Sequence, residues 1–237
     1  MGEFIKISKR GSEVMIKDKI LIFDLDNTII STPESLVNLH NKLKPNNQLI
    51  LPKQIDWKFS PMIKSDEELS ELFKLFDHKD FYGDTLAVFP NAIEVINKLA
   101  ENNRVIICSK HMESRKPLSE EWISKVMPKV KVVFVDDFED KGSLFPDCDV
   151  VVDDRVDCLD NFNNDCFKLL YGTYQWNRDS NYFEVENWCQ IEQVINNMFF
   201  YNKLNKLVDE FINTNNETIF KEEYECKWIG GNNNGDM

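Results

Sequence analysis

Two acidic residues directly follow an apolar run near the start of the chain. Ile20-Leu21-Ile22-Phe23 leads into Asp24-Leu25-Asp26-Asn27-Thr28. The apolar run predicts a buried strand, and residues two apart in a strand point to the same side. Both carboxylates would therefore face one way at the end of that strand. Acids that merely end a strand in an exposed turn are the ordinary alternative, but their position directly after four apolar residues favours a ligand-binding site.

Later apolar runs also end in polar residues that could contribute to such a site. These residues are Ser109-Lys110, Asp136-Asp137 and Asp153-Asp154. In an open sheet of parallel strands, ligands bind at the edge formed by the carboxyl ends of the strands. Asp24 and Asp26 would therefore lie where ligands bind.

Five apolar runs predict the strands that position these residues. The runs are Ile20–Phe23, Arg104–Cys108, Lys131–Val135, Asp149–Val152 and, less regular, Cys166–Tyr171. They are nearly continuous rather than alternating, which is typical of strands that are covered on both faces. The expected fold class is therefore α/β, with a Rossmann-like parallel sheet and helices on both of its faces.

Helical periodicity fills the connections between these strands. One apolar stripe lies between Asn91 and Asn102, and another lies between Pro117 and Pro128. The first two strands are separated by far more residues than one crossover helix needs, so residues 32–88 are expected to form a small helical cap inserted after the first strand. Residues 19–31 and 89–196 would form the core. An N-terminal extension (1–18) and a C-terminal helical extension with a mobile tail (197–237) would flank it.

The composition limits the class of protein. The 237 residues are 42% hydrophobic, which suffices for one domain with an insertion. Lys and Arg number 28 against 41 Asp and Glu, and the net charge of -13 argues against a stable nucleic-acid partner. No apolar stretch approaches the roughly 20 residues that cross a bilayer, and the start of the chain lacks the apolar segment of a signal peptide. We therefore expect a cytoplasmic protein without a membrane partner.

The run ILIFDLDNT resembles the first motif of the haloacid dehalogenase (HAD) superfamily, an apolar strand followed by DxDx(T/V). The resemblance extends over the expected core and implies a phosphatase. In that family the first Asp is a nucleophile that takes up a phosphoryl group and the second is a general acid and base, roles that would fall to Asp24 and Asp26. The chemistry is reasonable because a divalent cation reduces the repulsion between carboxylate and phosphate, while a second carboxyl group can protonate the departing alkoxide.

The family's second and third motifs have candidates as well. Val105-Ile106-Ile107-Cys108-Ser109 is similar to the second motif, an apolar strand that ends in Ser or Thr. The resemblance implies that Ser109 donates a hydrogen bond to a phosphate oxygen, and Lys110 beside it is a second candidate for phosphate contact. The third motif is a lone lysine, for which Lys141 is the candidate. It would offset the charge of the carboxylates and hold the transferring phosphoryl group.

The fourth motif, an apolar strand that ends in paired acids, has two candidates. Asp153-Asp154 follows the fourth expected strand, as the order in the family requires, whereas Asp136-Asp137 follows the third and is expected to be a solvated turn. The resemblance then implies a Mg²⁺ ion held by Asp24, by the backbone carbonyl of Asp26 and by one acid of the pair, with water completing an octahedron. Asp154 would be the direct ligand and Asp153 would act through water.

A narrower resemblance is to the 5'(3')-deoxyribonucleotidases. It rests on the segments FYGDTLAVFPNAIEVINKL, VIICSK, EEWISK and VVVDDRVDCL and on the later segments YQWN and ENW. These relatives carry a small helical cap, hydrolyse deoxynucleoside monophosphates, and hold the base with aromatic residues near the cap. Phe81 and Tyr82 are the first candidates for that contact, ahead of Trp57 and Phe59, because a base can stack on an aromatic ring. Packing in the core is the ordinary alternative for each.

The expected function is Mg²⁺-dependent hydrolysis of (deoxy)nucleoside 5'-monophosphates to nucleoside and phosphate through an aspartyl-phosphate. One alternative is a HAD phosphatase for another small phosphate ester or for a phosphorylated nucleic-acid end. A second alternative is a non-catalytic binding module on the same scaffold. The expected partner is the small-molecule nucleotide, and the oligomeric state is left open, with a homodimer as one alternative.

Overall fold

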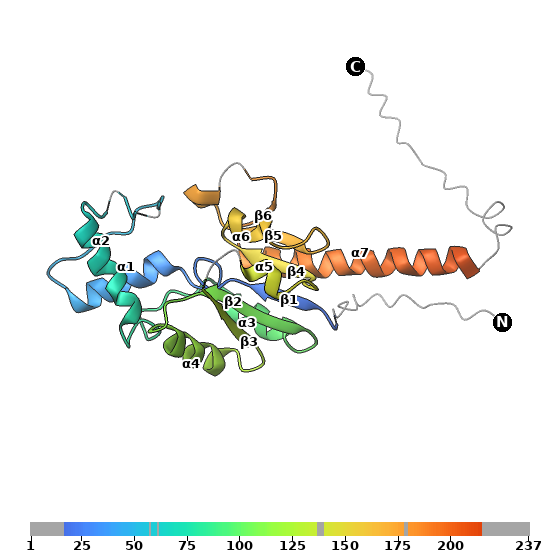
Figure 1. The fold of residues 1–237 in the computed structure, drawn as a ribbon, viewed down its shortest axis with the longest axis horizontal. Coiled ribbons are helices and arrows are strands. Elements are labelled where there is room, and N and C mark those ends of the chain that lie inside the picture. Colours follow the sequence, from blue (N-terminus) through green and yellow to red (C-terminus); the bar gives the residue numbers. More distant parts are fainter. Residues whose placement is uncertain (1–16, 57, 61, 137–139, 178–179, 215–237) are drawn as a thin grey trace, which may run out of the picture. The chain divides into compact units, whose positions relative to one another are not determined.

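A computed structural model gives the fold and describes residues 17–56, 58–60, 62–136, 140–177 and 180–214. In this part of the chain, six strands form one parallel sheet in the order β3-β2-β1-β4-β5-β6 (Figure 1). The strands are β1 (Ile20–Phe23), β2 (Arg104–Lys110), β3 (Lys131–Val135), β4 (Val150–Asp153), β5 (Phe167–Tyr171) and β6 (Phe183–Val185). The predicted fold class is confirmed.

The order of the strands places a reversal of direction beside β1. From β1 the chain moves outward through β2 to β3, and it then returns to β4 on the other side of β1. Crossovers between parallel strands are right-handed, so this reversal puts the helices after β1 and β2 on one face and those after β3 and β4 on the other. Sheets of this kind bind ligands where the order reverses, which here is between β1 and β4.

Helices cover both faces of the sheet and bury its central strands. The helix that directly precedes β2 is α3 (Ala92–Leu99), and the helix between β2 and β3 is α4 (Lys116–Val126). The helix between β3 and β4 is α5 (Asp140–Leu144), and the helix between β4 and β5 is α6 (Val156–Asp160). Every residue of β4 is buried, which explains why its sequence is apolar up to the terminal acid. Four of the five described cysteines are buried as well, and Cys189 is exposed.

A helical insertion occupies the connection between β1 and α3. It contains α1 (Thr32–Leu43), α2 (Asp66–Phe73) and the 3₁₀ helix η1 (Lys74–Asp77). Two backbone hydrogen bonds join the segments on either side of the insertion. The Ser31 N–H donates to the Ala87 carbonyl at 2.8 Å, and the Phe89 N–H donates to the Ile29 carbonyl at 3.0 Å. The chain therefore enters and leaves the insertion at adjacent points. The boundaries given above for core and cap stay predictions.

After β5 the chain forms the 3₁₀ helix η2 (Gln175–Asn177), then β6, and then α7 (Trp188–Thr214). The sequence did not predict β6, because the strand has three residues and two of them are exposed. Backbone contacts group the chain up to Asn196 into one compact unit and the chain from Asn197 into another. None of the described helices is both long and apolar enough to span a bilayer. The expected mobile tail and most of the N-terminal extension lie outside the described residues.

Candidate active site

Three buried aspartates meet where β1 and β4 end. Asp24 directly follows β1, Asp153 is the last residue of β4, and Asp154 comes next. The Asp24 N–H donates to the Val152 carbonyl at 2.9 Å. This hydrogen bond keeps the end of β1 next to the end of β4. One carboxylate oxygen from each aspartate lies within 4.8 Å of the other two. The fold therefore brings together the first acid and the later acid pair.

Lys141 reaches this cluster from α5 and is 1% exposed. Its Nζ donates to Asp24 Oδ1 and to Asp153 Oδ2, each at 2.7 Å. Burial disfavours the charged form of Lys141, but Asp153 and Asp24 outweigh this and raise its pKa well above the ordinary value. The close approach of α5 depends on Gly142, because a Cβ atom there would lie 1.9 Å from the carbonyl oxygen of Asn161.

Burial and mutual repulsion disfavour the charged forms of Asp24 and Asp154. Burial raises the pKa of Asp24 to about 7, although Lys141 acts in the opposite direction. Burial also raises the pKa of Asp154 well above its ordinary value, and repulsion from Asp153 and Asp24 adds to this effect. A donor set made of carboxylate oxygens suits a hard cation such as Mg²⁺. Asp24, Asp153 and Asp154 therefore fit the expected metal site.

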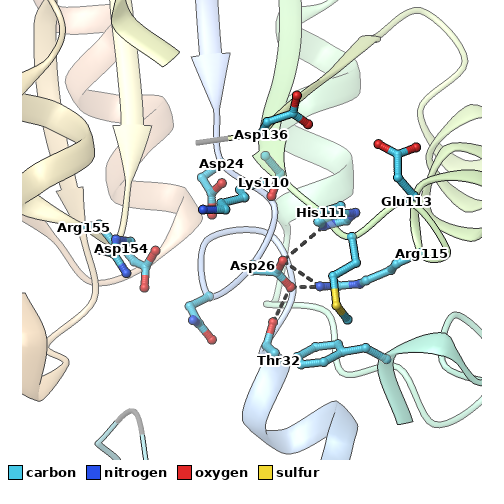
Figure 2. A pocket seen from close by; sticks show the side chains of 14 residues that line it. Asp24, Asp26, Thr32, Lys110, His111, Glu113, Arg115, Asp136, Asp154 and Arg155 are labelled. Atoms are coloured by element: carbon cyan, nitrogen blue, oxygen red, sulfur yellow. Dashed lines mark hydrogen bonds and ion pairs between the residues drawn. The ribbon is translucent and has the colours of Figure 1, made fainter. Parts of the chain in front are cut away.

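A pocket of about 520 Å³ opens over Asp24. Its volume lies in the range of small-molecule sites, roughly 300–1,000 Å³. In the view of Figure 2, Asp154 and Arg155 lie on one side of Asp24, while His111 and Arg115 lie on the other, next to Asp26. The lining residues are Asp24, Asp26, Asn27, Thr32, Phe76, Ser109, Lys110, His111, Met112, Glu113, Arg115, Asp136, Asp154 and Arg155.

Three side chains hold the carboxylate of Asp26 (Figure 2). Arg115 donates through Nη1 and Nη2 to its two oxygens, at 2.9 and 2.7 Å. The hydroxyl of Thr32 donates to Oδ1 at 2.6 Å, and His111 Nε2 lies 3.1 Å from Oδ2. Burial opposes the ionisation of Asp26, but Arg115 and His111 outweigh it and hold its pKa well below the usual range. Asp26 is therefore ionised in this arrangement.

Aromatic residues of the insertion surround Arg115, which is 5% exposed. Its guanidinium carbon lies 4.5 Å from the ring centre of Phe76, 5.1 Å from that of Phe81 and 5.6 Å from that of Tyr82. Its Nε also donates to the Tyr82 hydroxyl at 3.1 Å. Guanidinium groups pack favourably on aromatic faces. Arg115 therefore connects the insertion to Asp26 in the core.

The structure places the predicted phosphate contacts at the pocket. Ser109 and Lys110, the last two residues of β2, both line it, with Ser109 buried and Lys110 exposed. Asp136 also belongs to the lining, but its side chain is 92% exposed. Asp137 lies outside the described residues. Among the two acid pairs, Asp153-Asp154 is thus the pair that lies beside Asp24.

The predicted aromatic contacts in the described part of the chain, Phe59, Phe81 and Tyr82, are not among the residues that line the pocket. Phe81 is fully buried, Phe59 is 4% exposed, and the hydroxyl of Tyr82 is bonded to Arg115. In this arrangement Phe81 supports Arg115 and offers no exposed ring face to a base. Phe76 is the aromatic residue of the described chain that lines the pocket, and Trp57 lies outside the described residues.

Several lining residues were not expected from the sequence. They are Asn27, Thr32, Phe76, His111, Met112, Glu113 and Arg115. His111 and Arg115 come shortly after β2, and that position at the ligand-binding edge was the available indication. Asn27 has a left-handed backbone with a φ of 58°, and its Oδ1 is buried with no hydrogen-bond partner in the described part of the chain. Burying an acceptor without a partner costs about 1–3 kcal/mol, so a donor from a ligand would stabilise this site.

Comparison with known proteins shows similarity in structure. No family model matches the sequence, and no curated protein matches it. A HAD-superfamily hydrolase of subfamily IA, variant 1, from Geobacter sulfurreducens PCA superimposes with a TM-score of 0.50 and 10% identity, over 75% of this chain and 99% of that chain. The HAD-hydrolase YfnB from Bacillus subtilis, in a form bound to magnesium, superimposes with a TM-score of 0.49 and 12% identity. The superposition covers 76% of this chain and 100% of that chain. At 10% identity, the first similarity shows that the two chains share a fold.

Proposed function

We propose that this protein is a Mg²⁺-dependent phosphomonoesterase that hydrolyses (deoxy)nucleoside 5'-monophosphates through an aspartyl-phosphate on Asp24. The observation that carries the proposal is the position of Asp24 in a pocket of about 520 Å³, beside Lys141, Asp153 and Asp154. A lone carboxylate repels a phosphate group, and Lys141 together with a divalent cation removes much of that repulsion. The shared fold and the four motifs support the same chemistry.

The first half of the reaction transfers the phosphoryl group to Asp24. A carboxylate oxygen attacks phosphorus, the bond from phosphorus to the ester oxygen breaks, and the nucleoside leaves with a proton from Asp26. Lys141 and the hydroxyl of Ser109 hold the phosphoryl oxygens. Asp24, the backbone carbonyl of Asp26 and Asp154 would hold Mg²⁺, and Asp153 would act through water. The bound ion would supply positive charge that offsets the charge of the phosphoryl oxygens.

The second half hydrolyses the aspartyl-phosphate. Water attacks phosphorus, the bond from phosphorus to Asp24 breaks, and Asp26 takes the proton of the water. Accepting a proton suits the carboxylate that Arg115 and His111 keep ionised. Donating a proton in the first half needs the protonated form of Asp26, and this requires its pair with Arg115 to open.

The pocket offers contacts for the nucleoside part of the substrate. Phe76 and Met112 line it, and an aromatic face can stack on a base of any identity. The orphaned acceptor of Asn27 suits a sugar hydroxyl. Lys110 and Arg155 add positive charge at the pocket of a protein whose net charge is -13. The resemblance to the deoxyribonucleotidases favours a nucleotide over other small phosphate esters.

Phosphate release from a panel of substrates tests the proposal. The panel contains deoxynucleoside and nucleoside 5'-monophosphates, sugar phosphates and a 3'-phosphorylated oligonucleotide, each with Mg²⁺ titrated from zero. We expect fastest release from the deoxynucleotides, no release without Mg²⁺, and none from Asp24→Asn with an unchanged circular dichroism spectrum. Faster release from another class would assign the substrate to that class. No release from any substrate would leave the non-catalytic binding module, and activity of Asp24→Asn would remove the nucleophile.

A further inference from the structure

An indole group contacts the acid cluster from outside the pocket lining. Trp176, in η2, donates from Nε1 to Asp154 Oδ2 at 2.8 Å. Its ring is stacked on that of Tyr174, with centroids 4.5 Å apart and an angle of 4° between the planes. The indole is therefore held in a fixed plane by one neighbour while it bonds to one oxygen of Asp154.

The same pair of rings reaches the loop that carries Asp24 and Asp26. The hydroxyl of Tyr174 donates to the backbone carbonyl of Asn27 at 3.0 Å. The stacked rings therefore extend from the loop after β1 to the acid after β4, the two segments whose acids form the cluster. A shift of either ring would move one of these two segments relative to the other.

The backbone around the two rings is fixed by local contacts. The buried amide of Asn177 donates to the carbonyl oxygens of Gly172, Tyr171 and Asp154, at 3.0, 3.2 and 3.4 Å. Gly172 has a φ of 76°, and a Cβ atom on it would lie 2.7 Å from the ring of Tyr174. A glycine is thus required for the ring of Tyr174 to pack where it does.

We propose that Trp176 is a positioning residue for a divalent cation at Asp154, with Tyr174 holding the indole in place. A hydrogen bond to one carboxylate oxygen fixes the orientation of the other, which is then available to a metal ion. Groups that orient metal ligands in this way typically account for a 10–100-fold difference in metal affinity. The inference rests on the proposed function in one respect, namely that the acid cluster binds a divalent cation.

Binding of Mn²⁺ alone to the full chain tests the inference without catalysis. Free Mn²⁺ is followed by electron paramagnetic resonance in the wild type, Trp176→Phe, Asp154→Asn and Trp188→Phe. Trp176→Phe keeps an aromatic ring against Tyr174 but lacks the N–H donor, so we expect its Kd to rise about 10–100-fold. Trp188→Phe is the matched control, because it removes an indole bond of 2.9 Å to the carbonyl of Thr28, not to an acid of the cluster. Its Kd for Mn²⁺ should equal that of the wild type.

The outcomes separate the inference from the proposed function. If Asp154→Asn weakens Mn²⁺ binding and a folded Trp176→Phe does not, the positioning role of Trp176 is overturned and the metal site stands. If Asp154→Asn leaves the Kd unchanged, the metal site fails and the inference fails with it. If Trp176→Phe does not fold, NMR of the wild type tests the inference instead. The indole ¹H–¹⁵N resonance of Trp176 is assigned through its contact with the Tyr174 ring. We expect this resonance to shift when Mg²⁺ is added, and a resonance that does not shift overturns the inference.

Discussion

Arg115 bonds both carboxylate oxygens of Asp26, at 2.9 and 2.7 Å, from a position at the start of α4. Its guanidinium in turn packs on Phe76 and bonds the hydroxyl of Tyr82, and both of these residues belong to the insertion. The environment of Asp26 therefore depends on three segments that are far apart in the sequence. Any movement of the insertion against α4 would change what holds Asp26.

Removing Arg115 should destabilise the fold. Breaking a buried ion pair by removing one partner costs about 3–5 kcal/mol, and the 22% exposure of the Asp26 side chain favours the lower end of that range. We therefore expect Arg115→Met to lower the free energy of unfolding by about 3 kcal/mol in urea titrations with EDTA present. Arg115→Lys keeps the charge but loses the two-point contact, so it should lower the free energy of unfolding by less than Arg115→Met does.

The control is Arg155→Met, because the partner of Arg155, Asp157, is 61% exposed. This variant should lower the free energy of unfolding by about 0–1 kcal/mol. Equal decreases in Arg115→Met and Arg155→Met would contradict the interpretation of Arg115 and Asp26 as a buried ion pair.

The same pair should make stability depend on acid pH. The pKa of Asp26 lies below its value in the unfolded chain, about 3.9. The stabilisation is therefore fully present above that value and is lost as the pH falls through the lower pKa of the folded state. The difference in unfolding free energy between the wild type and Arg115→Met should shrink from pH 5 towards acid, as followed by urea titrations at a series of pH values. A difference that is constant or grows at acid pH would show that Asp26 is not the titrating partner.

The sequence was sufficient to predict five of the six described strands, because each of the five is a nearly continuous apolar run. The order of the strands, compared with the order of the HAD motifs, indicated which acids would lie beside Asp24. Asp24 and Asp154 follow strands that the fold class makes neighbours, and Lys141 was selected by its place in the chain order. The contact between Arg115 and Asp26 spans 89 positions and joins a helix start to a strand end, so no local pattern reports it. Helical periodicity also could not show that Phe76 lines the pocket and that Phe81 lies beneath Arg115.

Asp26→Asn should affect substrates according to how much their leaving group needs a proton. A sugar alkoxide leaves poorly without protonation, and general acid catalysis contributes about 10²–10⁴-fold. The second substrate is p-nitrophenyl phosphate, whose leaving group, p-nitrophenolate, leaves without a proton. The first turnover of each substrate is measured by rapid quench. Asp26→Asn should slow the release of nucleoside from the nucleotide far more than the release of p-nitrophenolate. Equal losses for both substrates would remove Asp26 as the proton donor.

The two acid pairs should respond differently to substitution. The side chain of Asp136 is 92% exposed, whereas Asp154 is 2% exposed and lies beside Asp24. We expect Asp136→Asn to leave activity nearly unchanged. Asp154→Asn should raise the Mg²⁺ concentration for half-maximal activity by at least about 10-fold. The opposite ranking would transfer the metal site to the pair at Asp136.

Gly142→Ala tests how Lys141 reaches the cluster. The added methyl group would lie 1.9 Å from the Asn161 carbonyl oxygen and 2.8 Å from the Phe162 nitrogen, so α5 must move away from the end of α6. Both contacts are to backbone atoms, which cannot rotate aside, and overpacking of this kind costs about 1–3 kcal/mol or more. Because Lys141 precedes Gly142, its bonds of 2.7 Å to Asp24 and Asp153 should lengthen. We therefore expect Gly142→Ala to lower both the Tm and kcat.

The control is Gly83→Ala, because its added Cβ would lie 3.0 Å from the Asp80 carbonyl oxygen, a much milder contact. This variant should lower the Tm less and leave kcat near the wild-type value. Full activity in Gly142→Ala would show that Lys141 does not depend on the contact between α5 and α6.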